Sequence, residues 1–221
     1  MNTVLRNSLV TATLVTGVIV GGVIFFQTTE SNRQVAIAAG EAKIGAPAPN
    51  FTGTDSNGKK HSLTDFKGKT VVLEWTNNDC PSVKKHYETN NMQKIQKSAT
   101  SKGVVWLTII SSAPGEQGFV NGEKANELTK SRAAAPTAVL LDPTGKIGRT
   151  YGARTTPHMF VINPTGNLVY MGAIDDKPTT DKADVPIAKN YVVEALDAVK
   201  AGKAVTTATS QPYGCSVKYG K

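Results

Sequence analysis

The chain contains two cysteines, Cys80 and Cys215, and the surroundings of the first suit thiol chemistry. Cys80 stands between a polar turn at residues 76–79 and Pro81, which is favoured in the first turn of a helix because its missing N–H would be unpaired there. Free backbone N–H groups and the helix dipole stabilise a thiolate at such a position. The sequence therefore predicts a cysteine that can attack sulfur or peroxide oxygen. The alternative is a small buried apolar side chain.

Charged neighbours of Cys80 act in opposite directions on its ionisation. Lys84 and Lys85 lie one turn into the predicted helix and favour the thiolate. The Asp79 carboxylate disfavours a second negative charge, unless its side chain caps the helix and points elsewhere. We expect the net shift of the cysteine pKa to be downward.

The second cysteine, Cys215, lies in a C-terminal tail at residues 202–221 that is rich in small and polar residues and could move or fold back over the domain. Three roles are open for it: a partner that resolves or exchanges with oxidised Cys80, a permanent disulfide with Cys80, or an unpaired thiol. Closing so long a loop would stabilise the fold by on the order of 5 kcal/mol, so a structural disulfide is credible.

An uncharged stretch at residues 8–26 would span about 28 Å as a helix, which is close to the hydrocarbon thickness of a bilayer. Arg6 precedes it, and a basic residue on the short N-terminal side favours export of the rest of the chain. We interpret residues 1–26 as a retained anchor; cleavage as a signal sequence after the Ala-Ile-Ala at residues 36–38 is the alternative. Export would permit a disulfide or a redox pair.

The net charge of +8 comes from lysines scattered singly and in pairs, without interleaved aromatic residues. This pattern is typical of a solvated basic surface, whereas a nucleic-acid partner would require a dense basic stripe or a recognisable module. The two cysteines also lack the paired spacing of a copper or zinc carrier. We therefore expect no nucleic acid, no metal and no other cofactor.

Alternating strands and helices are predicted for one domain at residues 44–201, which follows a linker at residues 27–43. A turn at residues 55–58 predicts a hairpin. Runs typical of strands occur at residues 71–73, 104–110, 138–141, 155–163 and 168–172, the last two as an antiparallel pair. Helices are predicted at residues 81–95, 117–131 and 187–199, with a short one that ends at Tyr151. Together these describe a layered α/β domain with a central mixed sheet.

In this order the motifs resemble the thioredoxin fold and, more narrowly, the redoxin group, which is the alkyl hydroperoxide reductase and thiol-specific antioxidant family. The motifs are residues 45–51, Lys67-Gly68-Lys69, residues 75–81, residues 141–145, and Thr156-Pro157 before residues 160–162. The resemblance implies a thioredoxin-like three-layer domain. It also implies that Pro157 is cis and packs beside the reactive cysteine.

Departures from these families limit what the resemblance implies. Val83 stands where a thioredoxin-like reductase has its second cysteine, which excludes dithiol exchange within one helical turn. Asn77 and Leu73 stand where a peroxiredoxin has threonine and proline. The peroxiredoxin arginine is not found near Thr156, although Arg154 could substitute for it. These differences are compatible with a slower thiol peroxidase.

The other candidates for the site are expected to surround Cys80. His158 follows Pro157 and is a better candidate than His86 for a histidine near the sulfur; the alternative is a surface or structural histidine. Trp75 and Asn77 are expected to shape the pocket, and Trp75 fits the core equally well.

The leading hypothesis is a membrane-anchored antioxidant, a peroxiredoxin-like oxidoreductase in which Cys80 reduces peroxide and is then captured by Cys215. One alternative is a thiol–disulfide exchange protein that acts on exported proteins through the same cysteines. Another is a non-catalytic binding or metallochaperone module. The expected partners are a peroxide or disulfide substrate, a thiol reductant and the membrane. The expected location is the extracytoplasmic (periplasmic) side of the cell envelope, as an anchored or secreted protein.

Overall fold

The computed structural model of the chain describes residues 41–220. The anchor or signal sequence predicted at residues 1–26, and most of the predicted linker, lie outside the described residues. Within residues 41–220, no helix is both long and apolar enough to cross a bilayer.

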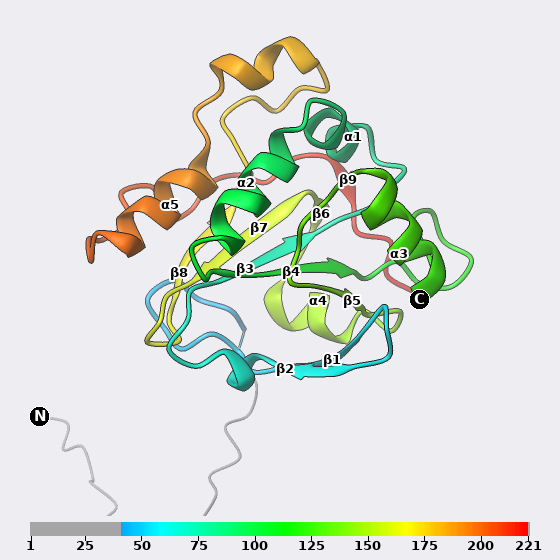
Figure 1. Cartoon of the computed structure of the whole chain (residues 1–221), viewed down its shortest axis with the longest axis horizontal. Helices are drawn as coiled ribbons and strands as arrows, with labels where there is room; N and C mark the ends of the chain where they lie inside the picture. The colour runs from blue at the N-terminus through cyan, green and yellow to red at the C-terminus, as the bar shows by residue number, and fades with distance from the viewer. Residues whose placement is uncertain (1–40, 221) are drawn as a thin grey trace, which may run out of the picture. The chain divides into compact units, whose positions relative to one another are not determined.

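Within the described residues, seven strands form one mixed sheet in the order β2-β1-β5-β4-β3-β7-β8 (Figure 1). The strands are β1 (Thr52–Asp55), β2 (Lys60–Ser62), β3 (Val71–Trp75), β4 (Val105–Ile110), β5 (Ala138–Leu141), β7 (His158–Ile162) and β8 (Leu168–Gly172). β4 runs parallel to both β3 and β5, and all other pairs in the sheet are antiparallel. The predicted hairpin and central mixed sheet are confirmed.

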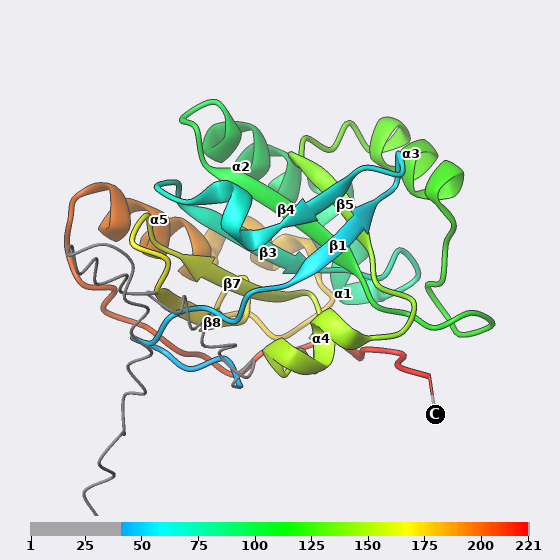
Figure 2. The same cartoon turned by 90° about the horizontal axis from the view of Figure 1, so that it is seen from below.

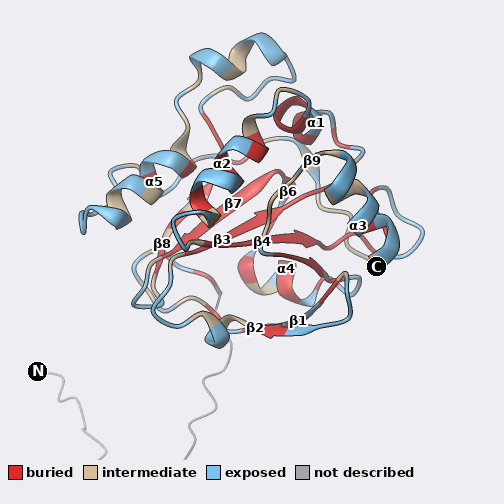
Figure 3. Cartoon of the chain, viewed as in Figure 1, coloured by how far each residue is buried: buried red, intermediate tan, exposed pale blue. Residues whose placement is uncertain are grey.

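Helices cover both faces of this sheet. They are α1 (Pro81–Glu88), α2 (Asn91–Thr100), α3 (Gly122–Ser131), α4 (Lys146–Tyr151) and α5 (Tyr191–Lys200). Alternate residues of β3 face opposite sides: Leu73 and Trp75 pack with α4, whereas Val72 packs with α1, α2 and α5. Because both sides are covered, all of β3 is buried, and four of its five residues are apolar, as such a strand favours (Figures 2 and 3).

Three predicted elements differ in extent. The helix predicted at residues 81–95 is two helices, because Asn90 takes a left-handed conformation with φ of 58° that ends α1 and begins α2. The helix predicted at residues 117–131 begins only at Gly122, where Asn121 caps it by accepting from the Lys124 N–H. Ile187, predicted to begin the last helix, lies in a 3-10 turn and is 70% exposed, outside the observed helix α5.

The strand predicted at residues 155–163 is also interrupted. Thr156-Pro157 is a cis peptide, as the resemblance implied, and it separates β6 (Thr155–Thr156) from β7. β6 leaves the main sheet and pairs in antiparallel fashion with β9 (Cys215–Ser216) near the end of the chain. The local sequence predicts a strand at residues 155–163, but not that its first two residues pair with β9 outside the main sheet.

The C-terminal tail folds back over the domain, which was one of its two predicted behaviours (red in Figures 1 and 2). Before the cysteine, Met171 N–H donates to Ala208 O at 3.1 Å. After it, Val217 N–H donates to Arg154 O at 2.9 Å, and Tyr219 OH donates to Ala153 O at 2.7 Å. The tail is therefore held on both sides of Cys215.

Candidate active site

Cys80 is the N-cap residue of α1 and is positioned by the turn that joins this helix to β3. Asn77 holds the turn together: its Oδ1 accepts from Asp79 N–H at 2.8 Å, and its carbonyl accepts from Cys80 N–H at 3.2 Å. Its amide also donates to Gln117 O at 3.2 Å. Asn77 thus lies in the site as a support of the turn, and Pro81 opens the helix as predicted.

Cys215 lies directly beside Cys80, although 135 positions separate them in the chain. The pairing of β6 with β9 sets Cys215 opposite Thr156. The Cys80 thiol donates to Thr156 O at 3.1 Å, and Cys215 N–H donates to Cys80 Sγ at 3.3 Å. Both cysteines are free thiols in this structure. The fold therefore brings together the two residues that the sequence named as candidate catalytic residues.

The two thiols differ in their ionisation. Burial would raise the pKa of the Cys80 thiol, but hydrogen bonds from the Cys215 thiol and from the N–H groups of Cys215 and Val83 lower it below its usual value of 9.0. Burial and the neighbouring Cys80 raise the pKa of Cys215 to about 11. Cys80 is therefore the better thiolate of the pair, whereas the Cys215 thiol stays protonated and donates a hydrogen bond to the Cys80 sulfur.

We expect the reduced protein to lose its thiol protons in two separate steps. The first lies below pH 9.0 and the second near pH 11, as followed by the ultraviolet absorbance of the thiolate. Replacing Cys215 by alanine removes a hydrogen bond to the Cys80 sulfur, so the pKa of Cys80 rises. An unchanged first step in Cys215→Ala would show that the Cys215 thiol does not stabilise the Cys80 thiolate.

The charged residues predicted to act on Cys80 have other surroundings. Lys84 is exposed on α1. Lys85 is buried, and its Nζ donates to Lys177 O at 2.8 Å and to Thr179 O at 3.1 Å. Asp79 is exposed and accepts from the neighbouring Asn78 amide, so it does not cap the helix. The hydrogen bonds to the Cys80 sulfur, and not these charged side chains, account for the lowered pKa of Cys80.

Trp75 and His158 lie in the core. Trp75 Nε1 donates to Ser111 Oγ at 3.0 Å, and its ring centroid lies 5.1 Å from that of Phe160. His158 is opposite Trp75 in the sheet, and its Nδ1 accepts from Arg154 N–H at 3.2 Å. Burial and the nearby Arg154 charge lower the pKa of His158 to about 3, so the ring is neutral. These surroundings agree with the alternative that His158 is a structural histidine.

Arg154 contributes to the site mainly through its backbone. Its carbonyl accepts from Val217 N–H and helps to fix the tail, while its side chain is exposed. The side chain borders an open cavity of about 840 Å³ together with Arg149, His158 and Tyr219. Neither cysteine lines this cavity. The structure does not bring the Arg154 guanidinium to the Cys80 sulfur as a peroxiredoxin-like arginine would require.

A second anchor of the tail was missed from the sequence. His86 Nδ1 accepts from the Asn91 amide at 2.9 Å, so its Nε2 donates to Tyr213 OH at 2.9 Å, and Tyr213 OH donates to Asp175 Oδ1 at 2.5 Å. Burial and the Lys85 charge lower the pKa of His86 to about 3 and keep the ring neutral. Tyr213 was detectable as one of two tyrosines, with Tyr219, in a tail that is rich in small and polar residues.

Glu74, also missed, is a fully buried carboxylate in the middle of β3. It accepts hydrogen bonds from Tyr87, Gln96, Trp106 and Thr108, at distances between 2.7 and 3.1 Å. Burial nevertheless raises its pKa. A charged residue within the run Val71–Trp75 was the sequence signal for this network.

We expect Glu74 to make the protein less stable as the pH rises. Because its folded pKa lies above the usual 4.5, the unfolded chain loses this proton first, and stability falls from about that pH upward through the folded pKa. Replacing Glu74 by glutamine removes this part of the pH dependence. Denaturant unfolding at several pH values checks it, and equal slopes in both proteins would contradict the raised pKa.

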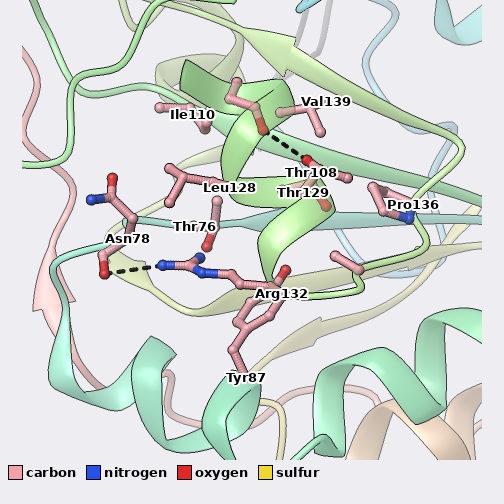
Figure 4. A pocket seen from close by; sticks show the side chains of 12 residues that line it. Thr76, Asn78, Tyr87, Thr108, Ile110, Leu128, Thr129, Arg132, Pro136 and Val139 are labelled. Carbon is pink, nitrogen blue, oxygen red and sulfur yellow. Dashed lines mark hydrogen bonds between the residues drawn. The ribbon is translucent and has the colours of Figure 1, made fainter. Parts of the chain in front are cut away.

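A small pocket next to this network does not reach the cysteines (Figure 4). Thr76, Tyr87, Thr108 and Arg132 are among its lining residues, and its volume is about 30 Å³. The Arg132 guanidinium lies 4.9 Å from the Tyr87 ring centroid and donates to Asn78 O at 3.3 Å. A space of this size suits a water molecule and no larger substrate. Among the described residues, no group of three or more histidine, cysteine or acidic side chains could hold a metal ion.

Comparisons with known proteins agree with this geometry. The family model described as Redoxin matches residues 43–192. The thiol-disulfide oxidoreductase ResA of Bacillus subtilis (strain 168) is 32% identical over 138 residues, which cover 61% of this chain and 70% of the relative. ResA of Bacillus thuringiensis subsp. konkukian (strain 97-27) is 32% identical over 127 residues, covering 58% of this chain and 68% of the relative.

A solved structure shares the fold. The crystal structure of a hypothetical protein, SMc02350 from Sinorhizobium meliloti 1021, superposes with a TM-score of 0.68 at 24% identity, and the match covers 80% of this chain and 95% of that one. Together with the family match, the mixed sheet and its covering helices confirm the thioredoxin-like α/β fold that the resemblance implied.

Proposed function

Because the chain belongs to the redoxin family and its relatives include thiol-disulfide oxidoreductases, we propose that it is a thiol–disulfide oxidoreductase that uses Cys80 and Cys215 as its redox pair. The observation that carries the proposal is the hydrogen bond of 3.3 Å from Cys215 N–H to Cys80 Sγ. The tail thus supplies the second cysteine of the pair. The helix lacks one because Val83 stands at the position where a thioredoxin-like reductase has it. The relatives favour this alternative over the leading peroxidase hypothesis.

The chemistry is a two-electron exchange. A thiolate of the pair attacks a substrate disulfide, forms a mixed disulfide and releases one substrate thiolate. The other cysteine then attacks the protein sulfur of that mixed disulfide, so that the second substrate thiolate leaves and Cys80 and Cys215 are joined. The substrate gains two electrons and the pair loses two. A thiol reductant returns the pair to its starting state by the reverse exchange.

The location and domain organisation form part of the same proposal. Residues 1–26 anchor the chain in the membrane, and residues 27–43 link this anchor to the redoxin domain at residues 44–201. In the alternative, cleavage after residues 36–38 removes the N-terminal segment as a signal sequence. The tail at residues 202–221 supplies Cys215. The domain then lies on the extracytoplasmic side of the cell envelope, where disulfide-bearing exported proteins are the substrates and disulfides persist.

Turnover of a disulfide-bonded peptide by a thiol reductant tests the proposal. We expect the full chain in detergent to accelerate this reaction, and the Cys215→Ser variant to lose turnover while keeping its fold. A rate equal to the uncatalysed exchange would contradict the proposal. Hydrogen peroxide serves as the comparison: the peroxidase hypothesis requires Cys80 to react with it faster than an ordinary free thiol, and we expect no such acceleration.

A further inference from the structure

We propose that outside thiols and disulfides exchange with this protein at Cys215, while Cys80 acts only on its partner inside the protein. This inference rests on the proposed function and deepens it, because it assigns a separate role to each cysteine. It reverses the order that the sequence suggests, in which the cysteine at the helix N-terminus meets the substrate first.

Access to the two sulfur atoms differs. Cys80 is 0% exposed and packs among Val83, Met159 and Tyr213, whereas Cys215 is partly exposed on β9. A thiolate must approach the sulfur that it attacks along the S–S axis, so a covered sulfur cannot be the point of entry. In this structure only the Cys215 side of the pair is open to a substrate.

The tail that covers Cys80 is fixed at several points. Ser210 Oγ accepts from Ala173 N–H at 2.9 Å, and Tyr213 OH donates to Asp175. On the other side of Cys215, Ala113 N–H donates to Lys218 O at 2.9 Å. Uncovering Cys80 would break these contacts together with the β6–β9 pairing. Exchange at Cys215 leaves all of them in place.

Cys80 is also the better leaving group. Its sulfur accepts from Cys215 N–H and lies at the N-terminus of α1, where negative charge is stabilised. The lowered pKa of Cys80 and the raised pKa of Cys215 agree with this assignment. Since the thiol with the lower pKa leaves faster, cleavage of the pair should release Cys80 as the thiolate.

The steps balance in both directions. An outside thiolate attacks Cys215 Sγ of the oxidised protein; a new S–S bond forms there, the bond between the cysteines breaks, and its electron pair goes to Cys80. A second outside thiolate then attacks the outside sulfur and releases Cys215 as a thiolate, which takes a proton from water. In reverse, Cys215 attacks the substrate disulfide, and Cys80 displaces the substrate thiolate from Cys215.

Trapping the mixed disulfide tests the assignment. The full chain is oxidised, the Cys80–Cys215 disulfide is verified by peptide mapping, and glutathione is added briefly before acid quenching and alkylation. We expect glutathione on Cys215 and the alkyl group on Cys80. The opposite labelling would overturn the inference. If the Cys80–Cys215 disulfide does not form, the proposed function fails at the first step, before the order of exchange is tested.

If the mixed disulfide is too short-lived to trap, single-cysteine variants show which cysteine reacts with outside thiols and disulfides. With glutathione disulfide, we expect Cys215 in Cys80→Ser to react at least about tenfold faster than Cys80 in Cys215→Ser, because only the former is accessible. Equal rates, or a faster Cys80, would overturn the inference.

A glycine substitution shows whether the tail is the barrier. Gly214 has a φ of 114°, and a Cβ there would clash with Thr156 O, so Gly214→Ala should lift the tail. Added to Cys215→Ser, it should raise the reaction rate of Cys80. Gly202→Ala is the matched control: φ is also positive, at 65°, but a Cβ meets open space. No increase with Gly214→Ala, or an equal one with Gly202→Ala, would contradict coverage by the tail.

Discussion

Replacing Cys80 by serine is expected to reduce disulfide exchange by on the order of 10³-fold or more, to the level of the uncatalysed reaction, as is typical for loss of a group that forms the covalent intermediate. Serine fits the site, because its hydroxyl can still donate to Thr156 O as the thiol does at 3.1 Å. A hydroxyl cannot form a disulfide, however. Turnover of a disulfide-bonded peptide measures the loss.

The control for this variant is a measurement that its fold is intact. Because serine keeps the hydrogen bond to the Thr156 carbonyl, we expect thermal unfolding close to that of the unchanged protein. Loss of activity with an intact fold then identifies the sulfur as the reacting group. Disulfide exchange that survives Cys80→Ser would show that the reaction does not need Cys80, and the proposed redox pair would be wrong.

Replacing Glu74 by leucine is expected to lower the free energy of unfolding by about 3–5 kcal/mol, because it leaves several buried neutral donors without an acceptor. The carboxylate accepts from Tyr87, Gln96, Trp106 and Thr108. All but Gln96, whose amide also donates to Tyr87 OH, would be left without an acceptor in the core. Each buried donor that loses its acceptor costs about 1–3 kcal/mol. Urea unfolding monitored by tryptophan fluorescence measures the change.

A matched variant separates the network from a simple loss of packing. Thr108→Val removes one donor, which is bonded at 3.1 Å to Glu74, and leaves the carboxylate with its three other partners. We expect it to cost only about 1 kcal/mol. If Glu74→Leu were no more destabilising than Thr108→Val, the carboxylate would not be the centre of this network.

The sequence predicts the parts of the fold that local pattern determines. β3 and β4 were predictable because strands covered on both faces are largely apolar, and each of these holds one polar residue, Glu74 or Thr108. The position of Cys80 was predictable because the polar turn and Pro81 define a helix start locally. The break at Asn90 was not, since a left-handed non-glycine residue leaves no strong signal in a helical pattern.

The site itself depends on contacts that no local pattern contains. Cys215 reaches Cys80 because β9 pairs with β6, and a two-residue strand in a polar tail has no detectable alternation. Tyr213 anchors that tail through Asp175, which comes from a loop far away in the sequence. The sequence named both cysteines, but only the fold shows that they lie together.

The most direct test of the proposed redox pair is peptide mapping of the full chain after mild oxidation. We predict one intramolecular disulfide between Cys80 and Cys215, formed with the loss of two hydrogens and reversed by a dithiol reductant. If oxidation leaves both cysteines as free thiols, or joins them only to other copies of the chain, Cys80 and Cys215 are not a redox pair and the proposed function is wrong.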